Sequence, residues 1–72
     1  MNDTPIPNTL REHRKKAGLT VMEVARALGF TSAERISAWE KGQSYPHITN
    51  LAKLSKLFGV QVHALYQNLF YE

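Results

Sequence analysis

Residues able to carry out catalysis or to bind a metal are few in this chain, and their spacing fits neither role. The three histidines, His13, His47 and His63, have no i, i+4 spacing, and there is no cysteine. A zinc site needs several such ligands brought together. The only aspartate is Asp3, so no Ser–His–Asp arrangement is credible, and there is no glycine-rich phosphate loop. We therefore expect no enzyme, no metal, no cofactor and no small-molecule substrate.

The charge balance favours an anionic partner. Nine Lys and Arg against six Asp and Glu give the 72 residues a net charge of +3. An ordinary basic domain has the same balance, so charge alone does not identify nucleic acid. No window approaches the roughly 18 apolar residues of a membrane span, and no apolar leader begins the chain, so we expect a cytoplasmic protein without a membrane partner.

Helix stop signals recur along the chain and predict an all-α fold. All four glycines, at positions 18, 29, 42 and 59, directly follow a segment with helical apolar spacing. We predict five short helices, over residues 8 or 9–17, 21–28, 32–41, 48–58 and 62–71. Residues 1–7 hold two prolines and are predicted to form a flexible N-terminal arm, and residues 8–72 a single domain with a C-terminal helix.

Two helix starts lie close together between Thr20 and Gly42. Thr20 with Glu23, and Thr31 with Glu34, have the spacing of capping boxes, in which each side chain bonds the other residue's backbone N–H. Two short helices joined by a tight turn are typical of a helix-turn-helix, whose second helix enters the DNA major groove.

The outward face of that second helix follows from its period of about 100° per residue. With Ile36 inward, Trp39 belongs to the core, and the residues that can reach base edges are Ser32, Glu34, Ser37 and Ala38. Glu34 can accept a hydrogen bond from cytosine N4, and Ala38 can touch a thymine methyl. The alternative that Glu34 is only a capping residue remains equally open.

Other residues suit phosphates, which position a protein without reading sequence. Arg35 and Lys41 flank the outward face. The start of the helix before it, at Val21, offers free backbone N–H groups and a positive dipole end.

Residues 10–66 resemble the XRE family, the phage-repressor and Cro type of helix-turn-helix domain. The matching segments are LREHRKKAGLT, EVARALG, ISAWEKG and PHITNLAKLSKLFGVQVHALY. The resemblance implies a lambda-repressor-like domain of five helices that binds operator DNA as a dimer. It also implies a partly buried ion pair between Arg14 and Glu40, with Arg14 able to approach a phosphate, and a second phosphate clamp that includes Lys41, Gln43 and Ser44.

Three features depart from the family pattern. The segment between Gly29 and Ile36 is one residue longer than the commonest form, which can shift the register of the second helix by one position. Val21 replaces a polar residue that often contacts DNA, and His47 stands where a Ser or Asp cap is usual. These departures affect individual contacts and leave the expected fold unchanged.

The C-terminal tail has more apolar surface than one short helix can bury. Its large side chains either pack on the domain's own core or form an interface between copies. The resemblance favours the interface, because the family dimerises through its C-terminal half. The dimer candidates are Tyr66, Leu69, Phe70 and Tyr71.

Together these features predict a sequence-specific transcriptional regulator, a repressor, that binds double-stranded DNA as a homodimer on a near-palindromic operator. An antitoxin or a controller that regulates its own operon, with a partner protein, fits equally well. A protein-interaction module with weak DNA affinity is a second alternative, supported by the small set of base-reading residues. A net charge of +3 disfavours a nonspecific nucleoid binder.

Overall fold

The computed structural model describes residues 5–67, which contain five helices joined by turns and loops and no strand. The all-α prediction is confirmed, and the predicted bounds of the fourth helix are those observed. The other four helices are shorter than predicted. The first and third begin later and end one residue earlier, and the second ends at residue 27. The fifth, predicted over 62–71, ends at residue 65, because the backbone of Tyr66 leaves the helical conformation (φ −134°, ψ 65°). The helices are α1 (Leu10–Lys16), α2 (Val21–Ala27), α3 (Glu34–Glu40), α4 (Ile48–Phe58) and α5 (Val62–Leu65).

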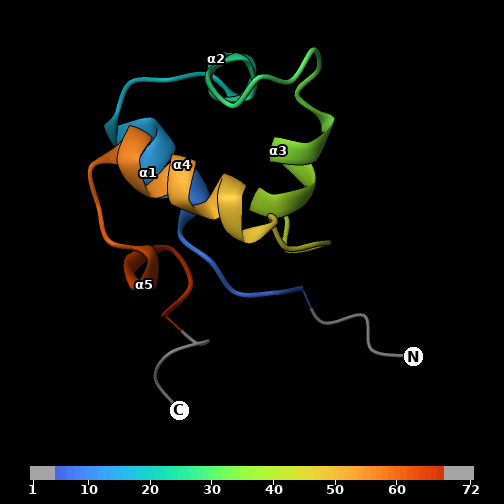
Figure 1. Cartoon of the computed structure of the whole chain (residues 1–72). Coiled ribbons are helices and arrows are strands. Elements are labelled where there is room, and N and C mark those ends of the chain that lie inside the picture. Colours follow the sequence, from blue (N-terminus) through green and yellow to red (C-terminus); the bar gives the residue numbers. More distant parts are fainter. Residues whose placement is uncertain (1–4, 68–72) are drawn as a thin grey trace.

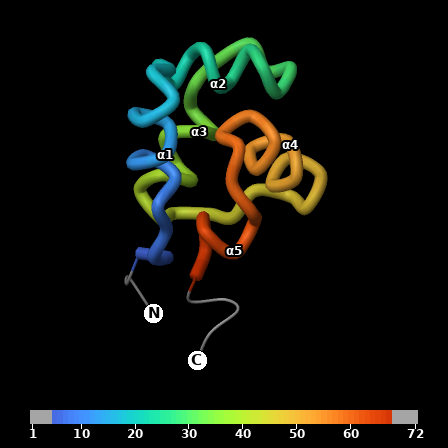
Figure 2. The backbone as a smooth tube through the Cα atoms, turned by 90° about the vertical axis from the view of Figure 1, so that its left-hand side faces the viewer, coloured from blue at the N-terminus to red at the C-terminus, as the bar shows by residue number. Residues whose placement is uncertain are grey.

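The helices pack around one core, with α2 and α3 in contact at one end and α4 and α5 at the other. Figure 1 shows α2 at the top and α5 at the bottom, with α3 to one side of the central helices. Both ends of the described chain lie at the α5 end (Figure 2). There the backbone N–H and the hydroxyl of Thr9 donate to the carbonyls of Leu65 and Ala64, at 3.0 Å and 2.6 Å, which ties the start of α1 to α5.

The core takes side chains from every helix. Trp39 is 4% exposed, which confirms its predicted inward position. Leu57 and Val60 are partly buried and pack against its edge. The fully or nearly fully buried apolar residues are Leu10, Val24, Ala25, Leu28, Ile36, Trp39, Leu51, Leu54, Leu65 and Tyr66.

One of the two predicted capping boxes is present. Glu23 N donates to Thr20 Oγ1 at 3.1 Å, and Thr20 N donates to Glu23 Oε1 at 2.8 Å. The second box, Thr31 with Glu34, was a wrong prediction, because α3 begins at Glu34 and Ala33 occupies the cap position without a side-chain bond. Glu34 is therefore the first residue of the helix, two positions before the third residue, which in a capping box reaches back to the cap.

The stretch before α1 lies against the end of α3. Ile6 N donates to the Gly42 carbonyl at 2.9 Å, and the Ile6 side chain packs against the core. Gly42 has a φ of +78°, and a Cβ at this position would lie 2.5 Å from Ile6 N. Glycine is thus required both by the backbone conformation and by the close approach of the chain. Residues 1–4 lie outside the described residues, and the predicted flexibility of the arm stays a prediction.

Candidate nucleic-acid interface

Helix α3 buries one face and leaves the opposite face open. Ile36 and Trp39 point into the core, whereas Glu34 is exposed. Ser37 and Ala38 are half-buried on the outer side. The three residues predicted on α3 to read bases therefore share its outer face. Ser32 was predicted on the same helix but lies in the bend that precedes it, where it is exposed.

The C-terminal end of α3 is fastened to α1 by an ion pair. Arg14 Nε donates to Glu40 Oε2 at 2.6 Å and Nη2 donates to Oε1 at 3.2 Å, so the pair is bidentate. The two side chains are only 13% and 9% exposed. The hydrogen bonds to Glu40 raise the pKa of Arg14, an effect that burial partly opposes. Arg14 Nη1 also donates to the Leu19 carbonyl at 2.9 Å. The Arg14–Glu40 pair implied by the family resemblance is thus present, and much of the guanidinium is already engaged within the protein.

Asn8 also holds the C-terminal end of α3, by hydrogen bonds that the sequence did not reveal. Its Nδ2 donates to the Trp39 carbonyl at 3.0 Å and lies 3.4 Å from that of Glu40, while its Oδ1 accepts from Leu10 N at 3.1 Å. Asn8 therefore serves the start of α1 and the end of α3 together, and it satisfies carbonyls that a helix C-terminus leaves free. The sequence places Asn8 only at the start of the first helix, because nothing local indicates a partner 31 residues away.

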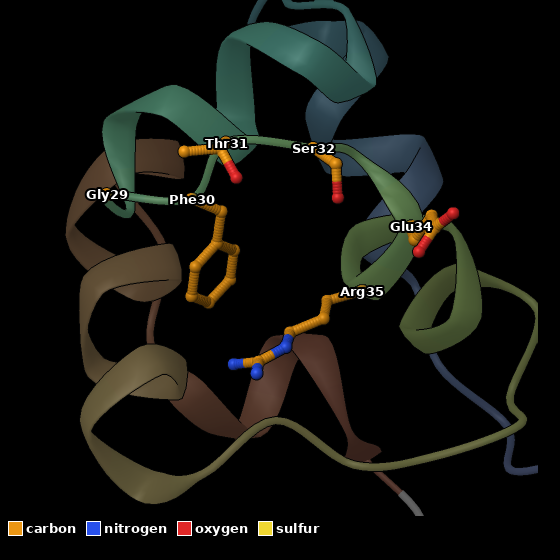
Figure 3. A pocket seen from close by; sticks show the side chains of 6 residues that line it. All are labelled: Gly29, Phe30, Thr31, Ser32, Glu34 and Arg35. Atoms are coloured by element: carbon orange, nitrogen blue, oxygen red, sulfur yellow. The ribbon is translucent and has the colours of Figure 1, made fainter.

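The turn between α2 and α3 encloses a hollow of about 400 Å³ (Figure 3). The guanidinium carbon of Arg35 lies 5.0 Å from the centre of the Phe30 ring, a cation–π contact. Phe30 in turn meets Trp39 edge-on, with ring centres 6.0 Å apart. Figure 3 shows the Arg35 and Glu34 side chains leaving α3 in different directions. Arg35, predicted to contact phosphate, is thus held in place by Phe30, a residue that the sequence did not single out.

The remaining phosphate candidates divide into two groups. The first group lies in the loop that directly follows α3, and its exposed members are Lys41, Gln43 and Ser44. The chain there is fixed by a bond from Gln43 N to the Ala38 carbonyl, at 2.9 Å. Val21, by contrast, packs its half-buried side chain against the core, which leaves only its backbone to serve the predicted role.

Tyr66 was predicted to contact a second copy, but it lies inside the core and is 0% exposed. The Tyr45 ring covers it, with ring centres 5.6 Å apart. The Tyr66 hydroxyl has no hydrogen-bond partner within the described residues. Burial, and to a lesser degree the neighbouring Tyr45, raises its pKa to about 12. The other dimer candidates, Leu69, Phe70 and Tyr71, lie outside the described residues.

Two large apolar residues that the sequence did not select are exposed instead. Tyr45 is 50% exposed and Ile48 is 66% exposed, the former in the loop after α3 and the latter at the start of α4. Among the described residues these are the large apolar side chains that a contact with another protein could bury.

The described residues contain no group of three or more His, Asp or Glu side chains placed to hold a metal ion. No helix within residues 5–67 has both the length and the apolar character needed to cross a membrane.

Two short helices, the second of which buries Ile36 and Trp39 and presents its other face, define a helix-turn-helix protein. The helix-turn-helix family model matches residues 10–65, so the chain belongs to this family, the XRE type. Neither the curated proteins nor the solved structures include a match to the chain. Family membership places the protein among DNA-binding transcription regulators.

Proposed function

We propose that this protein is a sequence-specific repressor that binds a near-palindromic operator as a homodimer. The observation that carries the proposal is the presentation of α3. Its inner face is anchored in the core by Ile36 and Trp39, and its C-terminal end is held by Arg14 and Asn8. A helix fixed in this way can place its outer face in the major groove without losing much conformational freedom on binding.

Base reading in this proposal rests mainly on Glu34. Without the second capping box, its carboxylate makes no bond to the Thr31 backbone within the described part of the chain and is free to accept from cytosine N4. The Ala38 methyl supplies an apolar contact for thymine, and Ser37 adds a hydroxyl at the edge of the same face. Lys41 and its neighbours in the loop after α3 would hold the phosphates on one side of the groove.

The dimer in this proposal uses the exposed apolar surface around Tyr45 and Ile48, together with the C-terminal tail. Because Tyr66 is buried, it would support Tyr45 from beneath and take no part in the contact itself. Sedimentation at high micromolar concentration should give a dimer, and Ile48→Gln should weaken it while Thr49→Ser, a change of one exposed neighbour, does not. A strict monomer at that concentration contradicts the proposed dimer.

The DNA proposal is tested by selection from a random duplex library at near-physiological salt. We expect a palindromic motif whose half-sites lie about one helical turn, or a small multiple of it, apart. Glu34→Ala should then relax the preference at one base pair, worth about 1–3 kcal/mol, whereas Glu12→Ala on the exposed side of α1 should not. Enrichment of no motif would overturn sequence-specific binding. The proposed role places the protein in the cytoplasm, at the nucleoid when DNA-bound.

A further inference from the structure

A shallow surface between α2 and α4 is not used by the DNA interface. We call it the α2–α4 groove. One hollow of about 300 Å³ is lined by Ala27, Leu28, Lys53, Lys56 and Leu57. A second, of about 330 Å³, lies beside it on α4 alone, shares both lysines and adds Ala52 and Ser55. In both views of the backbone α4 lies beneath α2 (Figure 1 and Figure 2). Only the first hollow takes residues from both sides, with Ala27 and Leu28 at the end of α2.

The groove combines an apolar floor with cations that have no counter-charge. Its floor is formed by Ala27, Leu28 and Leu57, and no acidic side chain lines either hollow. Lys53 and Lys56 are exposed, one turn apart on α4, and neither forms an ion pair within residues 5–67. Lysines three residues apart lie on the same helix face, so both ammonium groups border one apolar strip.

We propose that the α2–α4 groove binds an acidic amphipathic segment of a partner protein. Carboxylates three or four residues apart on a helical segment would meet Lys53 and Lys56, and an apolar side chain between them would cover Leu57 and Ala27. Charge complementarity of this kind sets the choice of partner and the association rate more than the affinity. Hollows of this size take one or two side chains, which matches a short segment rather than a domain.

Two other occupants fit the groove less well. A DNA backbone would use the lysines, but it gains nothing from the apolar floor. A second copy of this chain offers few acidic complements among its described residues. Glu40 is paired with Arg14 and Glu23 is engaged at its cap, while Glu12 and Glu34 are single exposed carboxylates on different helices. An acidic segment of another protein would pair with both lysines and would also cover the apolar floor.

The groove shares no residue with the candidate DNA interface, which consists of residues on α1, the start of α2, the α2–α3 turn, α3 and the loop after it. Partner binding therefore does not depend on the proposed operator, and a regulator could hold DNA and the segment together. Failure of one proposal leaves the other intact.

The test is a display selection of short random peptides on the immobilised wild-type protein. We expect enriched peptides that place two acidic residues around an apolar one. The double variant K53E/K56E should lower binding of an enriched peptide by about tenfold or more. K15E/K16E makes the same charge change at two exposed lysines of α1 and should leave binding within about twofold of the wild type. Circular dichroism checks that each variant is folded.

A second variant separates the floor from the charges. Ala27→Glu puts a carboxylate on the exposed last residue of α2, inside the groove, and should also abolish peptide binding. Enrichment of peptides without acidic residues overturns the proposal, as does an equal loss in K15E/K16E. It is overturned as well if K53E/K56E lowers retention on duplex DNA as much as Lys41→Glu does, or if it dissociates a dimer of this chain.

Discussion

Removing Arg14 should destabilise the fold more than any other single change of a polar side chain. Arg14→Ala leaves the Glu40 carboxylate, 9% exposed, without its bidentate partner, and it also removes the donor to the Leu19 carbonyl. Breaking one side of a buried pair costs about 3–5 kcal/mol. Because both side chains keep some contact with water, we expect a loss of about 2–4 kcal/mol.

This loss is large relative to the whole stability of such a domain. At 0.05–0.15 kcal/mol per residue, a 72-residue chain has a free energy of unfolding of about 4–11 kcal/mol. A domain of this size loses on the order of 4–8 °C in melting temperature per kcal/mol, so Arg14→Ala should melt on the order of 10–30 °C lower.

The assay is thermal and urea unfolding followed by far-ultraviolet circular dichroism. Arg11→Ala is the matched control, since Arg11 is an exposed arginine of the same helix, and it should change stability by about 0.5 kcal/mol or less. Arg14→Lys keeps the charge but not the bidentate geometry, so its stability should lie between those of Arg14→Ala and Arg11→Ala. Adding Glu40→Ala to Arg14→Ala should recover part of the loss, because no buried charge is then left alone. An Arg14→Ala protein that melts like the wild type would refute the reasoning.

Three further predictions concern local structure. Thr20→Ala should cost about 1 kcal/mol in urea unfolding, whereas Thr31→Ala, at the box that does not form, should cost less than about 0.5 kcal/mol; equal losses would contradict the observed caps. Gly42→Ala should destabilise more than Gly59→Ala, because both have positive φ but only Gly42 meets another segment, and hydrogen exchange at Ile6 N should speed up only in Gly42→Ala. Between pH 10 and about 12 native Tyr66 keeps a proton that the unfolded chain loses, so the stability of the wild type should fall by up to about 2–3 kcal/mol as pH rises through this window. Tyr66→Phe removes a hydroxyl that has no partner among the described residues, so it should match or exceed the wild type in stability at neutral pH. It should also show no such alkaline loss, as pH-dependent urea unfolding can check.

Features determined by neighbouring residues could be predicted from the sequence. The Thr20–Glu23 box, the bounds of α4 and the inward position of Trp39 depend on contacts within one or two helical turns. The Arg14–Glu40 pair joins distant residues, and it was anticipated only through the family resemblance.

Features set by tertiary packing could not be predicted. Thr31 and Glu34 have the spacing of a capping box, but the longer turn starts α3 at Glu34 and the box cannot close. The carbonyls that Asn8 serves and the ring beneath Arg35 are brought close only by the packing of α3. The sequence suggested that Tyr66 is an interface residue, because nothing near it in the chain indicates burial. The ring that covers it belongs to Tyr45, 21 positions earlier.

Competition between two duplexes measures most directly whether α3 reads DNA sequence. The labelled probe is a duplex enriched in the selection, and the competitors are the same duplex unlabelled and a scrambled duplex of equal composition, each titrated from about 50 to 200 mM salt. A sequence-specific regulator should prefer the enriched duplex by about 10³–10⁷, and the preference should persist as salt weakens both complexes. A ratio near one at every salt concentration would contradict base readout from α3 and leave only phosphate attraction.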